Sequence, residues 1–97
     1  MPHVRLSKRA QNDLPRLYKF LAQCDPDKAA QAIDTILSAF ENLHMPSIGA
    51  PVADAPGMRK LVIDFGAKGY MALYRHHKKT DVIVVLAIKH QNEDDYK

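Results

Sequence analysis

Seven consecutive apolar residues, from Val82 to Ile88, constrain the fold of this chain more than any other feature of its sequence. Most of them are β-branched, and no polar residue among them marks a side that faces solvent. A run of this kind is typical of a strand that is covered on both of its faces. The sequence therefore predicts a sheet in which residues 82–88 form an interior strand.

The residues before this run predict its partner strand, in a β-hairpin that extends from Gly69 to His90. Residues 78–81 are polar and few enough to make an exposed hairpin connection. The preceding residues alternate along a strand, and we expect their side chains to point to two different faces. One face carries Tyr70, Ala72, Tyr74 and His76, and the other carries Met71, Leu73, Arg75 and His77.

A first helix is predicted after Ser7. The Ser7 hydroxyl can accept a hydrogen bond from the first helical turn, and apolar residues follow at helical spacing from Ala10 to Leu21. Pro15 lies inside this segment, where a proline costs about 3 kcal/mol in an ideal helix. We therefore expect either a kink at Pro15 or a helix that begins near Asn12.

A second helix is predicted after Asp25, which is suited to the N-cap position and is followed by Pro26 at the first helical position. An apolar stripe then runs from Ala29 to Leu43, and Pro46 is expected to end the helix. Because few residues separate the two helices, we expect them to pack antiparallel as a helical hairpin.

The remaining segments complete the predicted order of elements. Residues 3–6 indicate a short strand at the sheet edge with Val4 and Leu6 inward, residues 45–57 a loop, and residues 58–65 a further strand. The order is therefore β-α-α-β-β-β in a single domain, residues 1–97. It predicts an α+β fold, with the helical hairpin packed on one face of a mainly antiparallel four-stranded sheet.

Composition narrows the class of protein to which the chain can belong. Its net charge of +3 permits an anionic partner without requiring one. Cys24 is the single cysteine and cannot form a disulfide within the chain, which favours a reducing compartment. No apolar run approaches the roughly 20 residues of a membrane helix, and we expect a cytoplasmic protein without membrane contact.

Cationic, imidazole and phenol side chains gather on the predicted strands and in the C-terminal tail. Such a set can supply the acid, the base and the phosphate clamp that cleave a phosphodiester, or it can hold the acidic surface of a partner. Two adjacent histidines in a strand point to opposite faces, so we predict no metal site, and no cofactor motif is present in the sequence. The residues are Arg59, Lys60, Tyr70, Tyr74, Arg75, His76, His77, His90 and Tyr96.

The order of elements and three sequence segments resemble the RelE/ParE superfamily of type II toxin–antitoxin toxins. The segments are MRKLVIDFG, GYMALYR and VVLAIKHQNEDDY, and the resemblance spans nearly the whole chain. It implies a small toxin that a cognate antitoxin neutralises in a hetero-oligomeric complex. It also implies one of two activities, and the residues at the functional positions indicate which of them this chain has.

RelE-like members of the superfamily cut messenger RNA on the ribosome with cations on their strands and a C-terminal Tyr, whereas ParE-like members poison DNA gyrase. Aligned on Gly69 and Tyr70, this chain has Met71 where the resemblance implies a clamp Arg, and Val62 and Asp64 where it implies Lys. Because most of the implied phosphate clamp is missing, we favour a ParE-like toxin that inhibits DNA gyrase by binding and is not an enzyme.

Two alternatives stay open at this point. His90 and Tyr96 match C-terminal positions that the resemblance implies for the ribonucleases, and with Arg75 they are the candidate catalytic residues of a ribosome-dependent mRNA endonuclease. A degenerate toxin that only binds its antitoxin is the other alternative. The acidic residues of the tail, 93–95, depart from the basic ending that the resemblance implies for ParE-like toxins.

The surface that binds partners is predicted to involve the strand cations and the end of the last strand. We expect the antitoxin to contact the helical hairpin and the sheet edge, and to reach Arg59 or Arg75 with acidic side chains. The predicted partner-binding residues are Arg59, Lys60, Tyr74, Arg75 and His90.

Overall fold

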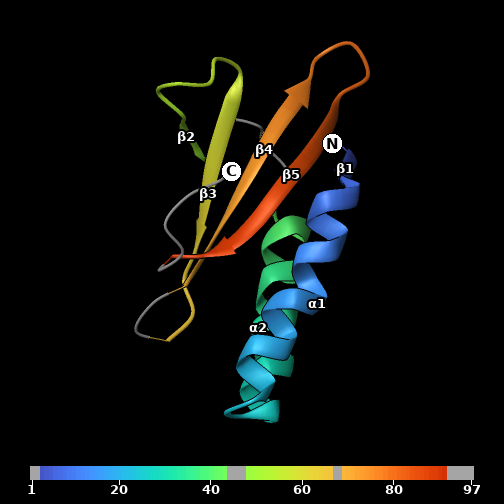
Figure 1. Ribbon diagram of the computed structural model, residues 1–97. Coiled ribbons are helices and arrows are strands. Elements are labelled where there is room, and N and C mark those ends of the chain that lie inside the picture. Colours follow the sequence, from blue (N-terminus) through green and yellow to red (C-terminus); the bar gives the residue numbers. More distant parts are fainter. Residues whose placement is uncertain (1–2, 44–47, 67–68, 92–97) are drawn as a thin grey trace.

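Two helices lie side by side over one face of a five-stranded sheet (Figure 1). The computed structural model describes residues 3–43, 48–66 and 69–91. The strands are β1 (His3–Leu6), β2 (Ala50–Pro51), β3 (Met58–Ile63), β4 (Tyr70–His77) and β5 (Val82–His90), and the helices are α1 (Lys8–Ala22) and α2 (Pro26–Glu41).

The strand order in the sheet is β1-β5-β4-β3-β2, with β1 parallel to β5 and every other neighbouring pair antiparallel. β5 lies between β1 and β4, which confirms the interior strand predicted for residues 82–88. β1 lies at the edge, as expected. The predicted α+β fold, with a helical hairpin on a mainly antiparallel sheet, is confirmed as well.

The predicted count of four strands is wrong, because β2 lies inside the segment that was expected to be a loop. Ala50 pairs with Lys60, and Pro51 pairs with Arg59. Two residues are too few to show an alternating pattern, and Pro51 has no N–H to donate, which confines it to an edge strand. The strand is therefore defined by its pairing with β3 and leaves no local signal.

The start of α1 is set by Ser7, whose Oγ accepts a hydrogen bond from the Ala10 N–H at 3.1 Å. The helix runs from Lys8 to Ala22 and includes Pro15, so the alternative start near Asn12 is wrong. Burial of one face of the helix against the sheet outweighs the local cost of the proline, since packing rather than propensity stabilises most helices in proteins.

The predicted cap of α2 is confirmed. The Asp25 carboxylate accepts hydrogen bonds from the N–H groups of Asp27 and Lys28 at 3.1 and 3.2 Å, and Pro26 occupies the first turn. The helix ends at Glu41, and Leu43 is buried just beyond it. The prediction that Pro46 ends the helix is wrong, because the helix ends before it, and Pro46 itself lies outside the described residues.

The core lies between the helices and the strand side chains that face them. Tyr70, Ala72 and Tyr74 of β4 all belong to it, which confirms that they share a face, and Val4 and Leu6 of β1 pack against it as predicted. We call the opposite side of the sheet the open face. On β3 and β4 the open face carries Met58, Lys60, Val62, Met71, Leu73 and Arg75.

A β-bulge interrupts the pairing of β4 with β5. Leu73 is opposite Ala87, but the next residue of β4, Tyr74, is opposite Val85, so Leu86 is the extra residue on β5. On β5 the core face therefore carries Ile83 and Val85 on one side of the bulge, and Ile88 and His90 on the other, where His90 is opposite Tyr70. Without the bulge, strict alternation would place His90 on the open face.

Polar groups of α1 and its cap cover the edge of β5 where β1 ends. The Ser7 Oγ donates to the Leu86 carbonyl at 3.0 Å, and the Ile88 N–H donates to the Asp13 carboxylate at 2.9 Å. Arg16 donates to the Ile88 carbonyl at 3.1 Å. We call these contacts of Ser7, Asp13 and Arg16 the α1–β5 bridge. They replace the hydrogen bonds that a longer β1 would make.

Replacing Asp13 tests the α1–β5 bridge. Asp13→Ala leaves the buried Ile88 N–H without its acceptor, and we expect the free energy of unfolding to fall by about 1–3 kcal/mol. Asp13→Asn keeps an acceptor oxygen and is expected to lose less. Urea unfolding followed by circular dichroism measures both variants, and equal stability of Asp13→Ala and the wild type would contradict the role assigned to the bridge.

Candidate functional site

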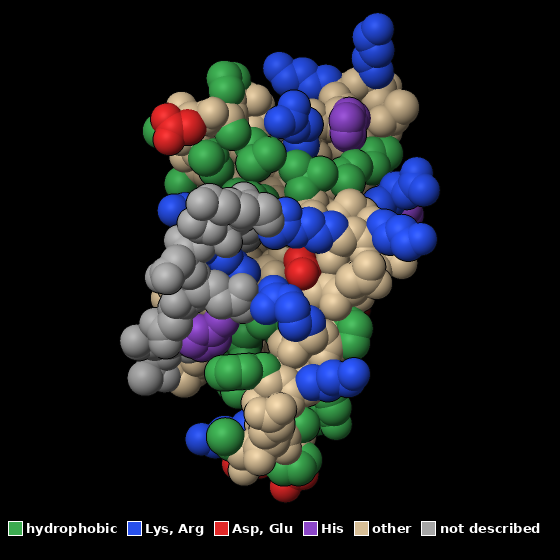
Figure 2. Space-filling model, viewed as in Figure 1, with side chains coloured by type: hydrophobic (Ala, Val, Ile, Leu, Met, Phe, Trp, Pro, Cys, Tyr) green, Lys and Arg blue, Asp and Glu red, His purple; other side chains and the backbone are tan. Residues whose placement is uncertain are grey.

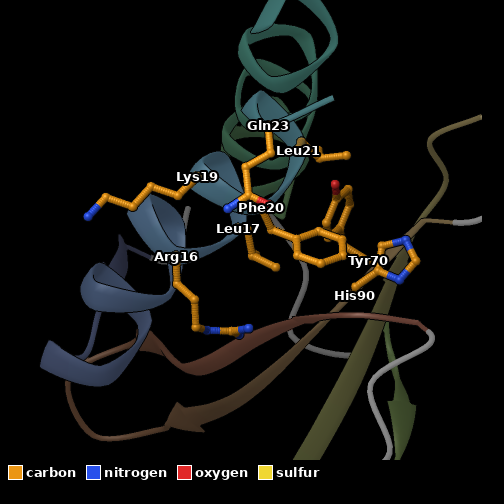
Figure 3. A pocket seen from close by; sticks show the side chains of 8 residues that line it. All are labelled: Arg16, Leu17, Lys19, Phe20, Leu21, Gln23, Tyr70 and His90. Atoms are coloured by element: carbon orange, nitrogen blue, oxygen red, sulfur yellow. The ribbon is translucent and has the colours of Figure 1, made fainter. Parts of the chain in front are cut away.

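A cavity of about 610 Å³ opens between the C-terminal half of α1 and the ends of β4 and β5 (Figure 3). This volume falls within the range of roughly 300–1,000 Å³ that is usual for ligand pockets. Helix α1 supplies most of the lining, and the hairpin supplies two aromatic rings. The lining residues are Arg16, Leu17, Lys19, Phe20, Leu21, Gln23, Tyr70 and His90.

Two aromatic rings from the hairpin form one wall of the cavity. Tyr70 and His90 are register partners on β4 and β5, and their ring centroids lie 5.3 Å apart with the planes at 83°. Phe65 packs behind Tyr70 at 6.2 Å between centroids. This edge-to-face arrangement is favourable for aromatic pairs and fixes the orientation of both rings. Burial raises the pKa of the Tyr70 phenol above its ordinary value near 10.

The rim of the cavity on α1 is cationic and carries an exposed aromatic ring. Arg16 and Lys19 lie along it, and 68% of Phe20 is exposed to solvent. None of the eight described residues that line the cavity is acidic. Figure 2 shows Lys and Arg side chains gathered over α1, where Asp13 is the one acidic residue of the helix. The site thus combines apolar walls with positive charge at its entrance.

The structure places His90, one of the predicted site residues, in this cavity. Arg75 lies elsewhere, because it is on the open face, opposite Met58 and Val84. Arg75 lies five positions along β4 from Tyr70, the register partner of His90, which amounts to about 17 Å along the strand. His90 and Arg75 are therefore not brought together. Tyr96 lies outside the described residues.

Tyr74 and Arg59 make contacts inside the fold. Tyr74 is fully buried, and its hydroxyl accepts a hydrogen bond from the Gly49 N–H at 2.8 Å. Arg59 donates to the Gly49 carbonyl. A Cβ atom at Gly49 would lie only 2.5 Å from the Lys60 carbonyl oxygen, so the close approach requires glycine. Tyr74 thus offers no surface to a partner, and Arg59 anchors the chain before β2.

Two other predicted residues, Lys60 and His76, lie on the open face of the sheet and next to the hairpin turn, respectively. Lys60 is half-buried on the open face, opposite Leu73. His76 pairs with Asp81 at 2.8 Å across the hairpin turn. Within residues 3–43, 48–66 and 69–91, no three His, Cys, Asp or Glu side chains gather as metal ligands, and no helix there is long and apolar enough to cross a membrane.

Sequence reasoning missed the contribution of α1 to the site. Arg16, Lys19 and Phe20 were not among the candidate residues, which all came from the predicted strands and the C-terminal tail. A signal was nevertheless present: Phe20 falls outside the apolar stripe that Leu14, Leu17 and Leu21 define. A large apolar residue on the polar face of an amphipathic helix points to a contact beyond the chain's own core.

Comparison with known proteins identifies the family of this fold and site. Residues 4–95 match the family model described as the ParE toxin of type II toxin–antitoxin systems, parDE. Toxin RelE3 of Caulobacter vibrioides is 38% identical over 94 residues, which cover 96% of this chain and 98% of that protein. The chain therefore belongs to the ParE toxin family, within the RelE/ParE superfamily, and is a toxin of a type II toxin–antitoxin system.

Solved structures share this fold. The chromosomal ParDE system from P. aeruginosa contains a chain with a TM-score of 0.76 and 23% identity, and the match covers 93% of this chain and 96% of that one. The RelBE2 toxin–antitoxin complex from Mycobacterium tuberculosis has a TM-score of 0.62 and 24% identity, with 95% and 93% covered. These likenesses establish the fold, and the family assignment rests on the sequence matches.

The raised pKa of Tyr70 predicts a loss of stability in alkali. Above about pH 10 the unfolded chain releases the phenol proton while the folded chain keeps it, so the free energy of unfolding falls as pH rises. Tyr70→Phe is expected to flatten this fall in urea unfolding between about pH 9 and 11. Tyr18→Phe, at a side chain that is 40% exposed, is the control. Parallel profiles for wild type and Tyr70→Phe would contradict the assignment.

Proposed function

We propose that this toxin acts in the ParE-like manner, by binding DNA gyrase in the cytoplasm and inhibiting it, and that a cognate antitoxin neutralises it. The match of residues 4–95 to the ParE toxin family supports the choice of gyrase. The relatives named ParDE and RelBE2 are toxin–antitoxin systems, which supports an antitoxin as the second partner and a hetero-oligomer as the neutralised state.

The observation that carries the choice of gyrase is an apolar pair on the open face. Val62 of β3 and Met71 of β4 are register partners there, and 53% of Val62 is exposed. The superfamily resemblance implies cations at these positions in the ribonucleases. Two apolar side chains cannot stabilise the charge that develops on a phosphodiester, and losing one positioned donor costs about 3–4 kcal/mol in transition-state stabilisation.

The separation of His90 from Arg75 supports the same choice. A general acid or base has to lie within about 3 Å of the atom with which it exchanges a proton. His90 lines the cavity on the helix side of the sheet, whereas Arg75 lies on the open face and about 17 Å farther along the strands. One bound phosphodiester could not contact both groups. Binding to a protein target has no such requirement.

Lys60 and Arg75 are the cations that we assign to the gyrase contact. Both lie half-buried on the open face. Lys and Arg side chains at such positions typically pack their aliphatic stems while the charge reaches solvent. Along the open face the register pairs run Val62 with Met71, Lys60 with Leu73 and Met58 with Arg75, so both cations lie on one side of the apolar pair. An apolar patch with cations beside it is the composition expected of a surface that binds an acidic protein partner.

A gyrase supercoiling assay tests this proposal. Purified toxin is expected to inhibit supercoiling, and Arg75→Glu is expected to weaken the inhibition about tenfold because it reverses a charge at the contact. Lys28→Glu makes the same charge change on an exposed residue of α2, and is expected to stay within about twofold of the wild type. Absence of inhibition at high micromolar toxin would contradict the proposal.

Primer extension on translated messages distinguishes mRNA cleavage, the ribonuclease alternative, from gyrase inhibition. We expect no cleavage in the ribosomal A site when toxin is added to translating ribosomes. Cuts that disappear in His90→Ala or Tyr96→Phe would contradict gyrase inhibition and establish mRNA cleavage as the activity.

Induction of the toxin without antitoxin is expected to arrest growth, and unchanged growth would favour a degenerate toxin that only binds its antitoxin.

A further inference from the structure

The end of the open face beside the hairpin turn carries a second group of cationic and imidazole side chains, away from the Val62 and Met71 pair. We propose that this end binds the phosphate backbone of double-stranded DNA. The choice of DNA rests on the proposed function, because the enzyme that the toxin inhibits acts on DNA. The group, which we call the hairpin-end cluster, consists of His3 and Arg5 of β1 and of Arg75 and His77 of β4.

The register of the sheet brings the hairpin-end cluster together in two rows across β5. The register partners are His3 and His77 for Val82, and Arg5 and Arg75 for Val84. Neighbouring strands lie about 4.8 Å apart, so the two members of a row are about 10 Å apart, and the rows follow each other at about 7 Å. All four side chains point to the open face, because the core residues next to them in sequence point to the helices.

Negative charge is missing from the strands that form this surface. None of the described strands, β1 to β5, contains Asp or Glu. Asp81 of the hairpin turn is paired at 2.8 Å with His76, which alternates with the cluster along β4 and points to the other face. Lys78 and Lys79 of the same turn add exposed positive charge. This end of the sheet therefore attracts an anionic partner.

The surface between the cations lacks the apolar centre of a protein interface. Val82 and Val84 are small and half-buried. The large apolar side chains that are exposed in the described part of the chain lie elsewhere, and they are Tyr18, Phe20, Leu37, Ile48 and Val62. Protein interfaces are anchored by large apolar and aromatic residues, whereas a DNA backbone is contacted mainly by Arg, Lys and polar donors. The composition therefore favours DNA over an acidic protein.

The size of the hairpin-end cluster suits several phosphates of one DNA strand. Each strand of a duplex carries one phosphate per roughly 3.4 Å of helix axis, so a surface of about 7 by 10 Å faces two or three of them. The guanidinium groups of Arg5 and Arg75 have the forked donors that match phosphate oxygens, and each imidazole ring offers an N–H donor. Such contacts read no base edges, so we expect binding without sequence preference.

Fluorescence anisotropy with a labelled DNA duplex of mixed sequence measures this contact in the absence of gyrase. The wild type is expected to bind, and its affinity is expected to fall as salt rises, because binding releases counterions from the DNA. We expect Arg5→Glu to weaken binding about tenfold and to reduce the slope of log affinity against log salt by about one. His77→Glu changes the other side of the cluster and is expected to weaken binding as well.

Two further variants control for charge and for folding. Arg5→Lys keeps the cation and is expected to bind nearly as the wild type does. Lys28→Glu makes the same charge change as Arg5→Glu at the start of α2, at the opposite end of the molecule from the hairpin turn (Figure 1), and is expected to change affinity less than about twofold. Urea unfolding of each variant checks that the fold is retained.

The supercoiling assay separates failure of this inference from failure of the proposed function. If the toxin inhibits gyrase but binds no duplex, the inference is wrong while the proposed function stands. The inference is equally wrong if folded Arg5→Glu and His77→Glu bind the duplex as the wild type does, or if duplex RNA binds and DNA does not. If the toxin binds DNA through Arg5 and does not inhibit gyrase, the DNA contact stands and the proposed function fails.

Discussion

The hydrogen bond from the Ile88 N–H to the Asp13 carboxylate is the contact on which the arrangement of this molecule depends. β1 pairs with β5 only as far as Val85, so the next backbone groups along that edge need other partners. The α1–β5 bridge supplies them and thereby fixes the position of α1 over the sheet. Because Arg16 belongs to the bridge and also lines the cavity, the same contacts that stabilise the fold shape the site.

Much of the fold could be predicted because its strongest signals are local. The apolar run at residues 82–88 identifies an interior strand, and the side chains of Ser7 and Asp25 mark where the helices begin. β2 could not be predicted, and the sequence left undecided whether α1 begins after Ser7 or near Asn12. Both depend on contacts between segments far apart in the sequence, which outweigh local preferences when the chain packs.

The site was harder to predict because alternation tells which residues share a face and not what covers that face. Tyr74 was correctly grouped with Tyr70, yet that face is the one the helices cover, which makes Tyr74 a core residue. Lys60 and Arg75 fall on the open face, where their predicted role in binding partners stays a prediction. The contribution of α1 to the cavity results from tertiary packing. Its only signal in the sequence is Phe20, an apolar residue outside the apolar stripe of the helix.

The bulge at Leu86 changes how this chain should be compared with its relatives. One extra residue in β5 reverses the face to which each later side chain of the strand points. His90 therefore lies on the helix side of the sheet and lines the cavity. A relative that lacks the extra residue could carry the same His at the aligned position and present it to the opposite side of the sheet. Identity in an alignment column thus does not guarantee a common role here, and residue counts between the turn and the strand end are the safer guide to function.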